Sequence, residues 1–182
     1  MTDETKQLII NAQSGDSKAF HRLVAMHDER IMVLAYQLMK NEQEAEDLYQ
    51  ESFVKAFKSL HTFRLESSFY TWLYRITVNT AINMKHKLAR MRLQEPREDF
   101  DPLDIIAASS QDKDSGEITQ AVKNAADTLP EKQRTVFILK YLQQMKIREI
   151  ADIMDIGDGT VKKYLFRAME KMRTELKEYR YV

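Results

Sequence analysis

The chain has 182 residues with 28 basic and 28 acidic side chains, so its formal net charge is zero, and its hydrophobic fraction of 43% is typical of a folded protein. It contains no cysteine, which excludes disulfide bonds and thiolate metal sites. No run approaches about eighteen apolar residues and the N-terminus carries Asp3 and Glu4, so we expect no secretory signal, no membrane insertion and a cytoplasmic location.

Only four glycines and three prolines are present, and the strong helix formers Leu, Met, Ala, Glu, Lys, Gln and Arg dominate, which predicts an all-α fold. Near the N-terminus a short helix over 6–12 ends at Gly15, and Ser17 is placed to cap the next helix. The apolar period then predicts helices over the following ranges: 17–40, as one long helix or two abutting ones, 42–60, and from Ser67 or Ser68 to about Arg92.

Opposite charges gather in neighbouring parts of this helical region. Residues 41–51 contain five acids and no base, and the helix dipole favours such acids near a helix N-terminus. Residues 71–92 contain five bases and no acid, and the aromatic-rich segment 63–75 lies between the two charged blocks. Aromatic rings beside cations suit stacked bases and phosphates, so the pattern indicates nucleic-acid binding.

A structural role explains part of the same segment. Phe69, Trp72, Leu73 and Ile76 recur with the period of an amphipathic helix, and such a stripe is most often buried in a core. Burial accounts less well for the next three helical turns, which carry only positive charge. The sequence pattern therefore supports both a core role and a binding role for these aromatic residues.

The periodic pattern stops near the middle of the chain. Residues 94–117 contain eight acids and two bases, with Pro96, Pro102 and Gly116 and little apolar periodicity. Such a composition is typical of a flexible linker that is extended by self-repulsion. We therefore expect two small helical domains with no shared core, over residues 1–93 and 119–182, joined by an acidic linker over 94–118.

The C-terminal part has the spacing of a helix-turn-helix. Helical signals resume near Ile118, and Pro130 marks a fresh helix start. Residues 147–154 predict a short helix, 155–159 a turn, and Thr160 the start of a second helix. The small Ala151 stands where the two helices approach, and the following residues supply the apolar contacts of the motif: Ile150, Met154, Ile156, Val161 and Leu165.

The second helix of this motif divides into an inward apolar stripe and a basic outer face. The outward residues are Lys162, Lys163, Phe166, Arg167 and Lys171. Lys and Arg on the N-terminal half of such a helix can reach guanine edges or phosphates in the major groove. Any exposed helix carries Lys and Arg for solvation. Solvation alone does not explain the turn pattern or the outward Phe166.

Several motifs in a fixed order carry a resemblance to a known family: AEDLYQE at 45–51, SFYTWLYRITVN at 68–79, LPEKQR at 129–134, and EIA at 149–151 with GTVK at 159–162. The chain closely resembles the extracytoplasmic-function (ECF) sigma factors, the smallest members of the bacterial RNA polymerase sigma factor family. The resemblance implies a non-enzymatic protein without cofactor or metal that binds core RNA polymerase, through its largest and second-largest subunits, and directs it to promoter DNA. An anti-sigma factor, often membrane-anchored, commonly holds such proteins inactive.

The resemblance also implies roles for individual residues. The acidic helix would dock on the clamp helices of the largest polymerase subunit through the following residues: Glu46, Asp47, Gln50, Glu51 and Phe53. The next loop and helix would open the minus-10 element, with a flipped base and phosphates held by this set: Phe63, Arg64, Ser67, Phe69, Tyr70, Trp72, Arg75, Asn79 and Lys85. The helix-turn-helix would read the minus-35 element through these residues: Thr160, Lys162, Lys163, Phe166, Arg167 and Lys171.

Two positions depart from the family pattern. Asn83 stands where Asp is common, which removes a local salt bridge expected there, and Asp155 stands in the turn where Gly is common. Asp tolerates the left-handed conformation, so we expect the turn to survive.

Two other classes of protein share part of this pattern. A helix-turn-helix repressor or a response-regulator output domain would explain the C-terminal part, but not the aromatic and basic segment. An all-α metalloenzyme would need converging ligands. Glutamates of the acidic helix could cluster, but no Glu-x-x-His pair exists and the four histidines fall at no ligand spacing.

Overall fold

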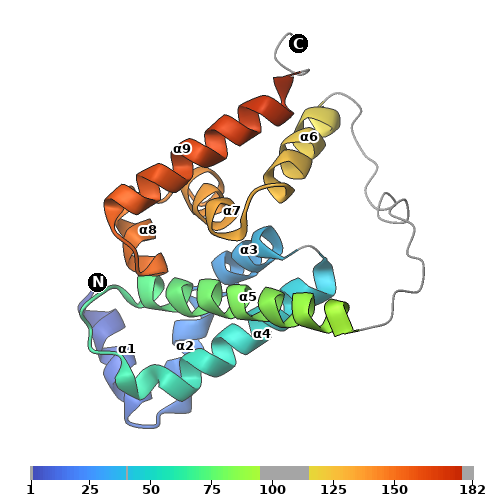
Figure 1. Ribbon diagram of the computed structural model, residues 1–182. Coiled ribbons are helices and arrows are strands. Elements are labelled where there is room, and N and C mark those ends of the chain that lie inside the picture. Colours follow the sequence, from blue (N-terminus) through green and yellow to red (C-terminus); the bar gives the residue numbers. More distant parts are fainter. Residues whose placement is uncertain (1, 40, 95–114, 178–182) are drawn as a thin grey trace.

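The computed structural model describes residues 2–39, 41–94 and 115–177, with side chains for 2–39, 41–91 and 121–177. Most of the expected acidic linker, over 94–118, lies outside the described residues. The described residues form helices and no strands, so the all-α expectation is confirmed (Figure 1).

The N-terminal half contains five α-helices and a short 3-10 turn. Their bounds are α1 Asp3–Gln13, α2 Ser17–Ala25, α3 Asp28–Leu38, α4 Glu42–Ser59, η1 Leu60–Thr62 and α5 Phe69–Gln94. The C-terminal half contains α6 Ser115–Asp127, α7 Glu131–Phe137, the single π-turn η3 Ile138–Leu142, α8 Ile147–Met154 and α9 Asp158–Glu175. Figure 1 shows α5 between α4 on one side and the C-terminal helix α8 on the other.

Polar side chains fix where several helices begin. The side chain of Asp16, and not Ser17, caps α2 by accepting hydrogen bonds from the N–H groups of Lys18 and Ala19 at 2.9 and 3.2 Å. A carboxylate is the stronger acceptor and its charge suits the helix N-terminus, which explains why the expected Ser17 cap is wrong. Ser68 caps α5, since its Oγ accepts from the N–H of Thr71 at 3.0 Å.

The helix-turn-helix forms with one shift at the turn. Its first helix, α8, has the predicted bounds. Asp155 adopts the left-handed conformation at φ 53°, as expected from its ability to replace glycine there. The second helix begins at Asp158, two residues before the predicted Thr160, because the acid in its first turn complements the helix dipole.

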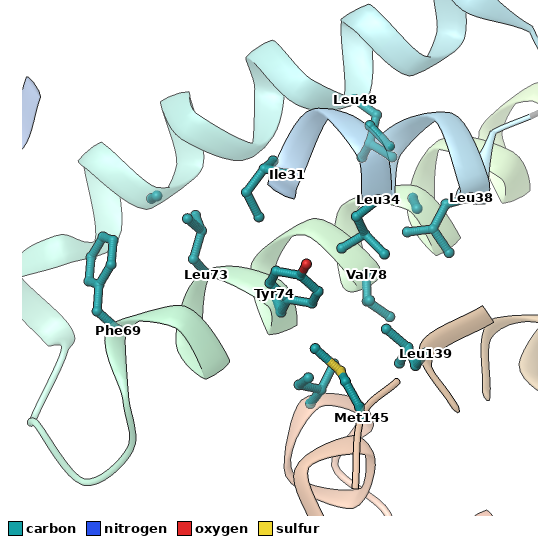
Figure 2. Close-up of a cluster of buried hydrophobic side chains, with 14 of the residues drawn as sticks. Ile31, Leu34, Leu38, Leu48, Phe69, Leu73, Tyr74, Val78, Leu139 and Met145 are labelled. Atoms are coloured by element: carbon teal, nitrogen blue, oxygen red, sulfur yellow. The ribbon is translucent and has the colours of Figure 1, made fainter. Parts of the chain in front are cut away.

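The two halves share one hydrophobic core, so the expectation of separate cores is wrong. Figure 2 shows Leu139 and Met145 of the C-terminal half beside Tyr74 and Val78 of α5. Buried Ile150 of α8 belongs to the same cluster. The helical period predicts which face of α5 is apolar. It does not predict that distant segments of the chain cover two opposite sides of that helix. A smaller second cluster lies within the C-terminal half alone, between α6, α7 and α9.

Candidate nucleic-acid interface

The acidic residues of α4 lie on the surface. Glu46, Asp47, Gln50 and Glu51 are exposed, and Glu51 forms an ion pair of 3.4 Å with Lys55 one turn later. Phe53 is half-buried because its ring packs edge-on against Tyr49, with 5.0 Å between the ring centroids. These side chains present carboxylates and one amide on one helix, where they can meet a basic partner surface.

Two apolar side chains of α4 extend this surface. Val54 and Phe57 are 44% and 57% exposed. The ring of Phe57 rests edge-on against Phe20 of α2, with 5.0 Å between centroids. Gln50, Val54 and Phe57 follow one another at the spacing of one helix face. Sequence reasoning missed this extension because the same spacing also describes a buried stripe.

A cavity of about 480 Å³ opens beside the loop that joins η1 to α5. Five residues of the expected minus-10 set line it: Phe63, Arg64, Ser67, Trp72 and Arg75. Thr62, Glu66 and Asp152 complete the lining and were missed by sequence reasoning. Asp152 could not have been found from the sequence because it lies on α8, on the other half of the chain.

Two aromatic side chains, Phe63 and Trp72, contribute to the lining of this cavity. The rings of Phe63 and Trp72 lie 5.0 Å apart and those of Phe69 and Trp72 lie 5.5 Å apart. Phe69 is only 2% exposed and does not line the cavity, so it supports Trp72 from within the core. The expectation that Phe69 offers its ring to a base does not fit this arrangement, because the start of α5 turns that side chain toward the N-terminal core.

Tyr70 lies apart from the cavity, among residues of α3 and α5. Its ring is half-buried, packs 4.2 Å from that of Tyr74 and carries the guanidinium of Arg30 at 5.6 Å from its centroid. Burial raises the pKa of the Tyr70 hydroxyl. Burial, aided by Arg30, lowers the pKa of the neighbouring His27, so that imidazole stays neutral at physiological pH. Tyr70 is therefore a neutral aromatic contact in this arrangement.

Two other residues of the expected minus-10 set lie elsewhere on α5. Asn79 is exposed and lines neither cavity. Lys85 lines a second cavity of about 730 Å³, between α5 and the start of α7, where Asn83, His86 and Glu131 also lie. The structure thus separates the expected set into five residues that line the pocket and four that do not.

The outer face of α9 has the predicted basic character. Lys162, Lys163 and Arg167 are exposed and Phe166 is 64% exposed, whereas the inward stripe includes buried Val161, Ala168 and Met172. Thr160 is half-buried in the first turn of the helix. Lys171 differs from the others because its ammonium donates a hydrogen bond to the carbonyl oxygen of Thr128, just after α6.

The described parts of the chain contain neither a metal site nor a membrane-spanning helix. In residues 2–39, 41–94 and 115–177, no group of three or more His, Asp or Glu side chains is placed to hold a metal ion. No helix among these residues is both long enough and apolar enough to cross a bilayer.

Comparison with known proteins places this geometry in a family. Residues 23–91 match the family of sigma-70 region 2, and residues 119–172 match the family of sigma-70, region 4. The chain is 36% identical to the RNA polymerase sigma-H factor of Pseudomonas aeruginosa, over 92% of this chain and 91% of that protein. It is 32% identical to the ECF RNA polymerase sigma factor SigW of Bacillus subtilis, over 95% and 97%.

Solved structures show the same fold. CnrH, solved in complex with the cytosolic domain of CnrY, is similar with a TM-score of 0.69 and 24% identity, over 97% of this chain and 99% of that one. RpoE of Bartonella quintana, solved with the anti-sigma factor NepR, also has a TM-score of 0.69 and 24% identity, over 88% and 98%.

The paired regions and the full-length relatives exclude an isolated repressor domain and a metalloenzyme. Both the aromatic segment and the helix-turn-helix belong to matched regions of one protein class. The chain belongs to the ECF sigma factors of the sigma-70 family, non-enzymatic transcription initiation factors that direct RNA polymerase to promoter DNA.

Proposed function

We propose that this sigma factor acts through three separate surfaces, each with its own partner. The α4 surface binds the clamp of the largest polymerase subunit, the pocket beside the η1–α5 loop captures a flipped base of the minus-10 element, and the outer face of α9 reads the minus-35 element. The observation that carries the proposal is that the aromatic Trp72 and the cations Arg64 and Arg75 line one pocket, which combines what base stacking and phosphate binding both need.

The α4 surface suits a basic protein partner. Its acids are exposed, so they lose little hydration energy in the free protein and can steer a positively charged clamp by long-range attraction. Val54 and Phe57 add exposed apolar area next to these acids, which the partner can bury. Phe53 supports this surface through its contact with Tyr49 and does not project fully from it.

The pocket has the size and chemistry for one flipped nucleotide. Its volume of about 480 Å³ falls in the range of small-molecule sites. Trp72 offers a ring surface and rests against the buried Phe63, and stacking of about 1–3 kcal/mol per base can offset the few kcal/mol that unstacking costs. Arg64 and Arg75 stand at the same cavity and hold the phosphates, with Lys85 farther along α5.

The α9 surface suits the major groove of the upstream duplex. Lys162, Lys163 and Arg167 project from the N-terminal half of the helix, where a helix-turn-helix contacts base edges. Phe166 can contact a thymine methyl group in the same groove. We further propose that the C-terminal half contacts the second-largest polymerase subunit, so that α9 is held at a fixed distance from the pocket.

Two domains and a regulator complete the proposal. We assign residues 1–93 and 119–182 to separate functional domains, joined by the acidic segment 94–118. The protein works in the cytoplasm with the polymerase. An anti-sigma factor, membrane-anchored or free, controls it. The fold neighbour RpoE was solved with the anti-sigma factor NepR, which supports the last point by analogy.

Transcript mapping tests this function. Core polymerase with and without the protein transcribes fragmented genomic DNA, and the RNA 5′ ends are sequenced. We expect new start sites that share two upstream elements at a fixed spacing and that vanish when core polymerase is used alone. New start sites with no common element, or no new start sites, would contradict the proposal.

A further inference from the structure

The chain segment that leads into the pocket is bonded to the N-terminal helix α1. Nε2 of Gln13, the last residue of α1, donates hydrogen bonds to the main-chain carbonyl oxygens of Leu60 and Phe63, each at 2.9 Å. Leu60 begins the turn η1 and Phe63 directly follows it. Both acceptors are carbonyls, so only the amino group of the glutamine fits here, with one hydrogen for each. A single side chain thus holds both ends of η1.

Gln13 can hold this turn because α1 itself is fixed by apolar packing. Leu8, Ile9 and Ala12 of α1 are buried in the shared hydrophobic core. Ile9 lies four positions before Gln13, so the two side chains project from the same face of the helix. The Gln13 side chain is itself half-buried. A donor that packing holds in place fixes its acceptors more firmly than a donor on a mobile side chain would.

The bonded turn forms part of the pocket. Thr62 and Phe63 line the cavity, and the next residues along the chain that line it are Arg64, Glu66 and Ser67. The buried ring of Phe63 lies 5.0 Å from that of Trp72, which also lines the cavity. The bond from Gln13 to the Phe63 carbonyl therefore fixes the position of the aromatic side of the pocket.

The loop between this turn and α5 is anchored at its other end too. Oγ of Ser68 accepts from the N–H of Thr71 at 3.0 Å, and the two hydroxyl groups lie 2.8 Å apart. Between the anchors Leu65 adopts the left-handed conformation at φ 61°, which disfavours any residue with a β-carbon relative to glycine. Such a residue persists only where the surrounding structure holds it. The shape of the loop therefore depends on its anchors.

The match to a known family leaves α1 without a role. The residues matched to sigma-70 region 2 begin at 23, after the end of α1 at Gln13. Gln13 does not line the cavity, although its amide bonds the backbone of a residue that does. Any effect of Gln13 on DNA must therefore act through the loop and not through direct contact with the flipped base.

We propose that Gln13 is a positioning residue for promoter opening, which acts from α1 to set the shape of the loop before α5. The inference rests on the proposed function of the pocket. A loop that already has its final shape need not be ordered when the flipped base arrives, and this lowers the cost of base capture. Gln13 should thus affect the opening step, and it should leave the binding of core polymerase by α4 and of the upstream duplex by α9 unchanged.

Two substitutions at one position test the proposal. Gln13→Met keeps an unbranched side chain of similar length but removes both donors, whereas Gln13→Lys supplies an ammonium that can donate to both carbonyls. Gln7→Met is the matched control, because Gln7 is an exposed glutamine of α1 whose amide bonds Asn11 of the same helix at 2.9 Å. Each variant is combined with core polymerase on a promoter that the wild-type holoenzyme opens. Opening kinetics at several holoenzyme concentrations separate the affinity of the closed complex from the rate of opening.

We expect the opening rate with Gln13→Met to fall about tenfold, since lost hydrogen bonds of ordinary strength shift the population of the competent loop by about that factor. The affinity of the closed complex should stay within about twofold of wild type. Gln13→Lys should recover most of the rate, and Gln7→Met should match wild type. A role in general stability would instead lower both quantities together.

Fluorescence of the free protein gives an independent measure of the loop. Trp72 is the single tryptophan of the chain and lines the pocket beside Phe63. Release of the Phe63 carbonyl should let water reach the indole ring, so we expect a red shift of the emission in Gln13→Met. The emission should return toward the wild-type maximum in Gln13→Lys and stay unchanged in Gln7→Met.

Three results would overturn the positioning role. They are a wild-type opening rate with Gln13→Met, an equal loss of rate in Gln13→Met and Gln13→Lys, and a loss of core polymerase binding by both variants. Arg64→Ala, which alters a proposed pocket residue, is measured alongside to separate this inference from the proposed function. Slow opening with Arg64→Ala and a wild-type rate with Gln13→Met overturn the positioning role alone. Wild-type rates with both variants overturn the assignment of the pocket as well.

Discussion

Arg134 of α7 donates a hydrogen bond of 2.7 Å to the carbonyl oxygen of Leu38, the last residue of α3, across 96 positions of sequence. That carbonyl is one of the orphan acceptors at a helix C-terminus, where a cation is favoured by the helix dipole. The same guanidinium forms an ion pair of 3.0 Å with Asp127 at the end of α6. One side chain thus connects α3, α6 and α7.

Loss of this connection should destabilise the whole chain. Arg134→Ala leaves the Leu38 carbonyl and the Asp127 carboxylate without this donor, and hydrogen bonds to charged groups contribute about 1.5–3 kcal/mol. We expect the free energy of unfolding in urea to fall by about that amount. Lys132 is exposed and lies two positions away, so Lys132→Ala is the control and should change the free energy of unfolding little. A fall confined to the C-terminal half would show that Arg134 does not join the halves.

We expect Phe69 to contribute to the stability of the fold more than to DNA binding. Phe69→Ala empties a buried site beside Phe63 and Trp72, and such truncations cost about 3–5 kcal/mol. Phe166→Ala removes a ring of the same size that is 64% exposed, so its thermal unfolding should match wild type. Comparable stability of the two variants would place the Phe69 ring outside the core.

Promoter opening should depend on an exposed residue of the pocket. Arg64 lines the cavity but is exposed, so Arg64→Ala is expected to leave folding and closed-complex binding intact. Permanganate reactivity of thymines near the start site should fall several-fold, because a phosphate or base contact made only in the open complex is lost. Arg148→Ala, on an exposed arginine of α8 that does not line the cavity, is the control. Wild-type reactivity of the Arg64 variant would remove this residue from the minus-10 site.

Binding to core polymerase should depend on the charge of α4. Reversal of both acids in Asp47→Lys with Glu51→Lys turns attraction to a basic clamp into repulsion, and we expect co-purification with core enzyme to be lost. Helix content should persist because both side chains are exposed. Glu29→Lys reverses an exposed acid on α3 and should still co-purify. Retained binding by the double variant would mean that these acids only form a hydrated surface of the helix and do not contact the polymerase.

Sequence reading by α9 can be separated from general attraction to phosphates. Arg167→Ala and Lys163→Ala should each relax discrimination at particular upstream base pairs, by about 1–3 kcal/mol for a good contact. Lys171→Ala should weaken binding to all upstream sequences alike and flatten the salt dependence, and it should also loosen α6 because Lys171 bonds the Thr128 carbonyl. A matrix of promoter variants measures both effects. A uniform loss with Arg167→Ala and Lys163→Ala would make this face a phosphate clamp.

Local sequence determined the helices and the outward surfaces. The all-α class, the bounds of α8, the left-handed Asp155 and the exposed basic face of α9 follow from propensity, periodicity and turn chemistry, which act over a few residues. The motifs in their order led to the ECF sigma factor family, which the comparisons confirm. Local errors were small, as at Asp16, where two neighbouring residues could both cap a helix.

Only the tertiary structure decided how the halves meet. Tyr74 and Gln143 are 69 positions apart, and nothing in either local pattern indicates that they bond. No local pattern indicates that Asp152 lines the pocket. The apolar period that includes Phe69 is equally compatible with a base contact and with a place in the core, and the structure places this ring in the core. A helical period specifies which face of a helix is apolar, whereas the partner that covers this face depends on the packing of distant segments.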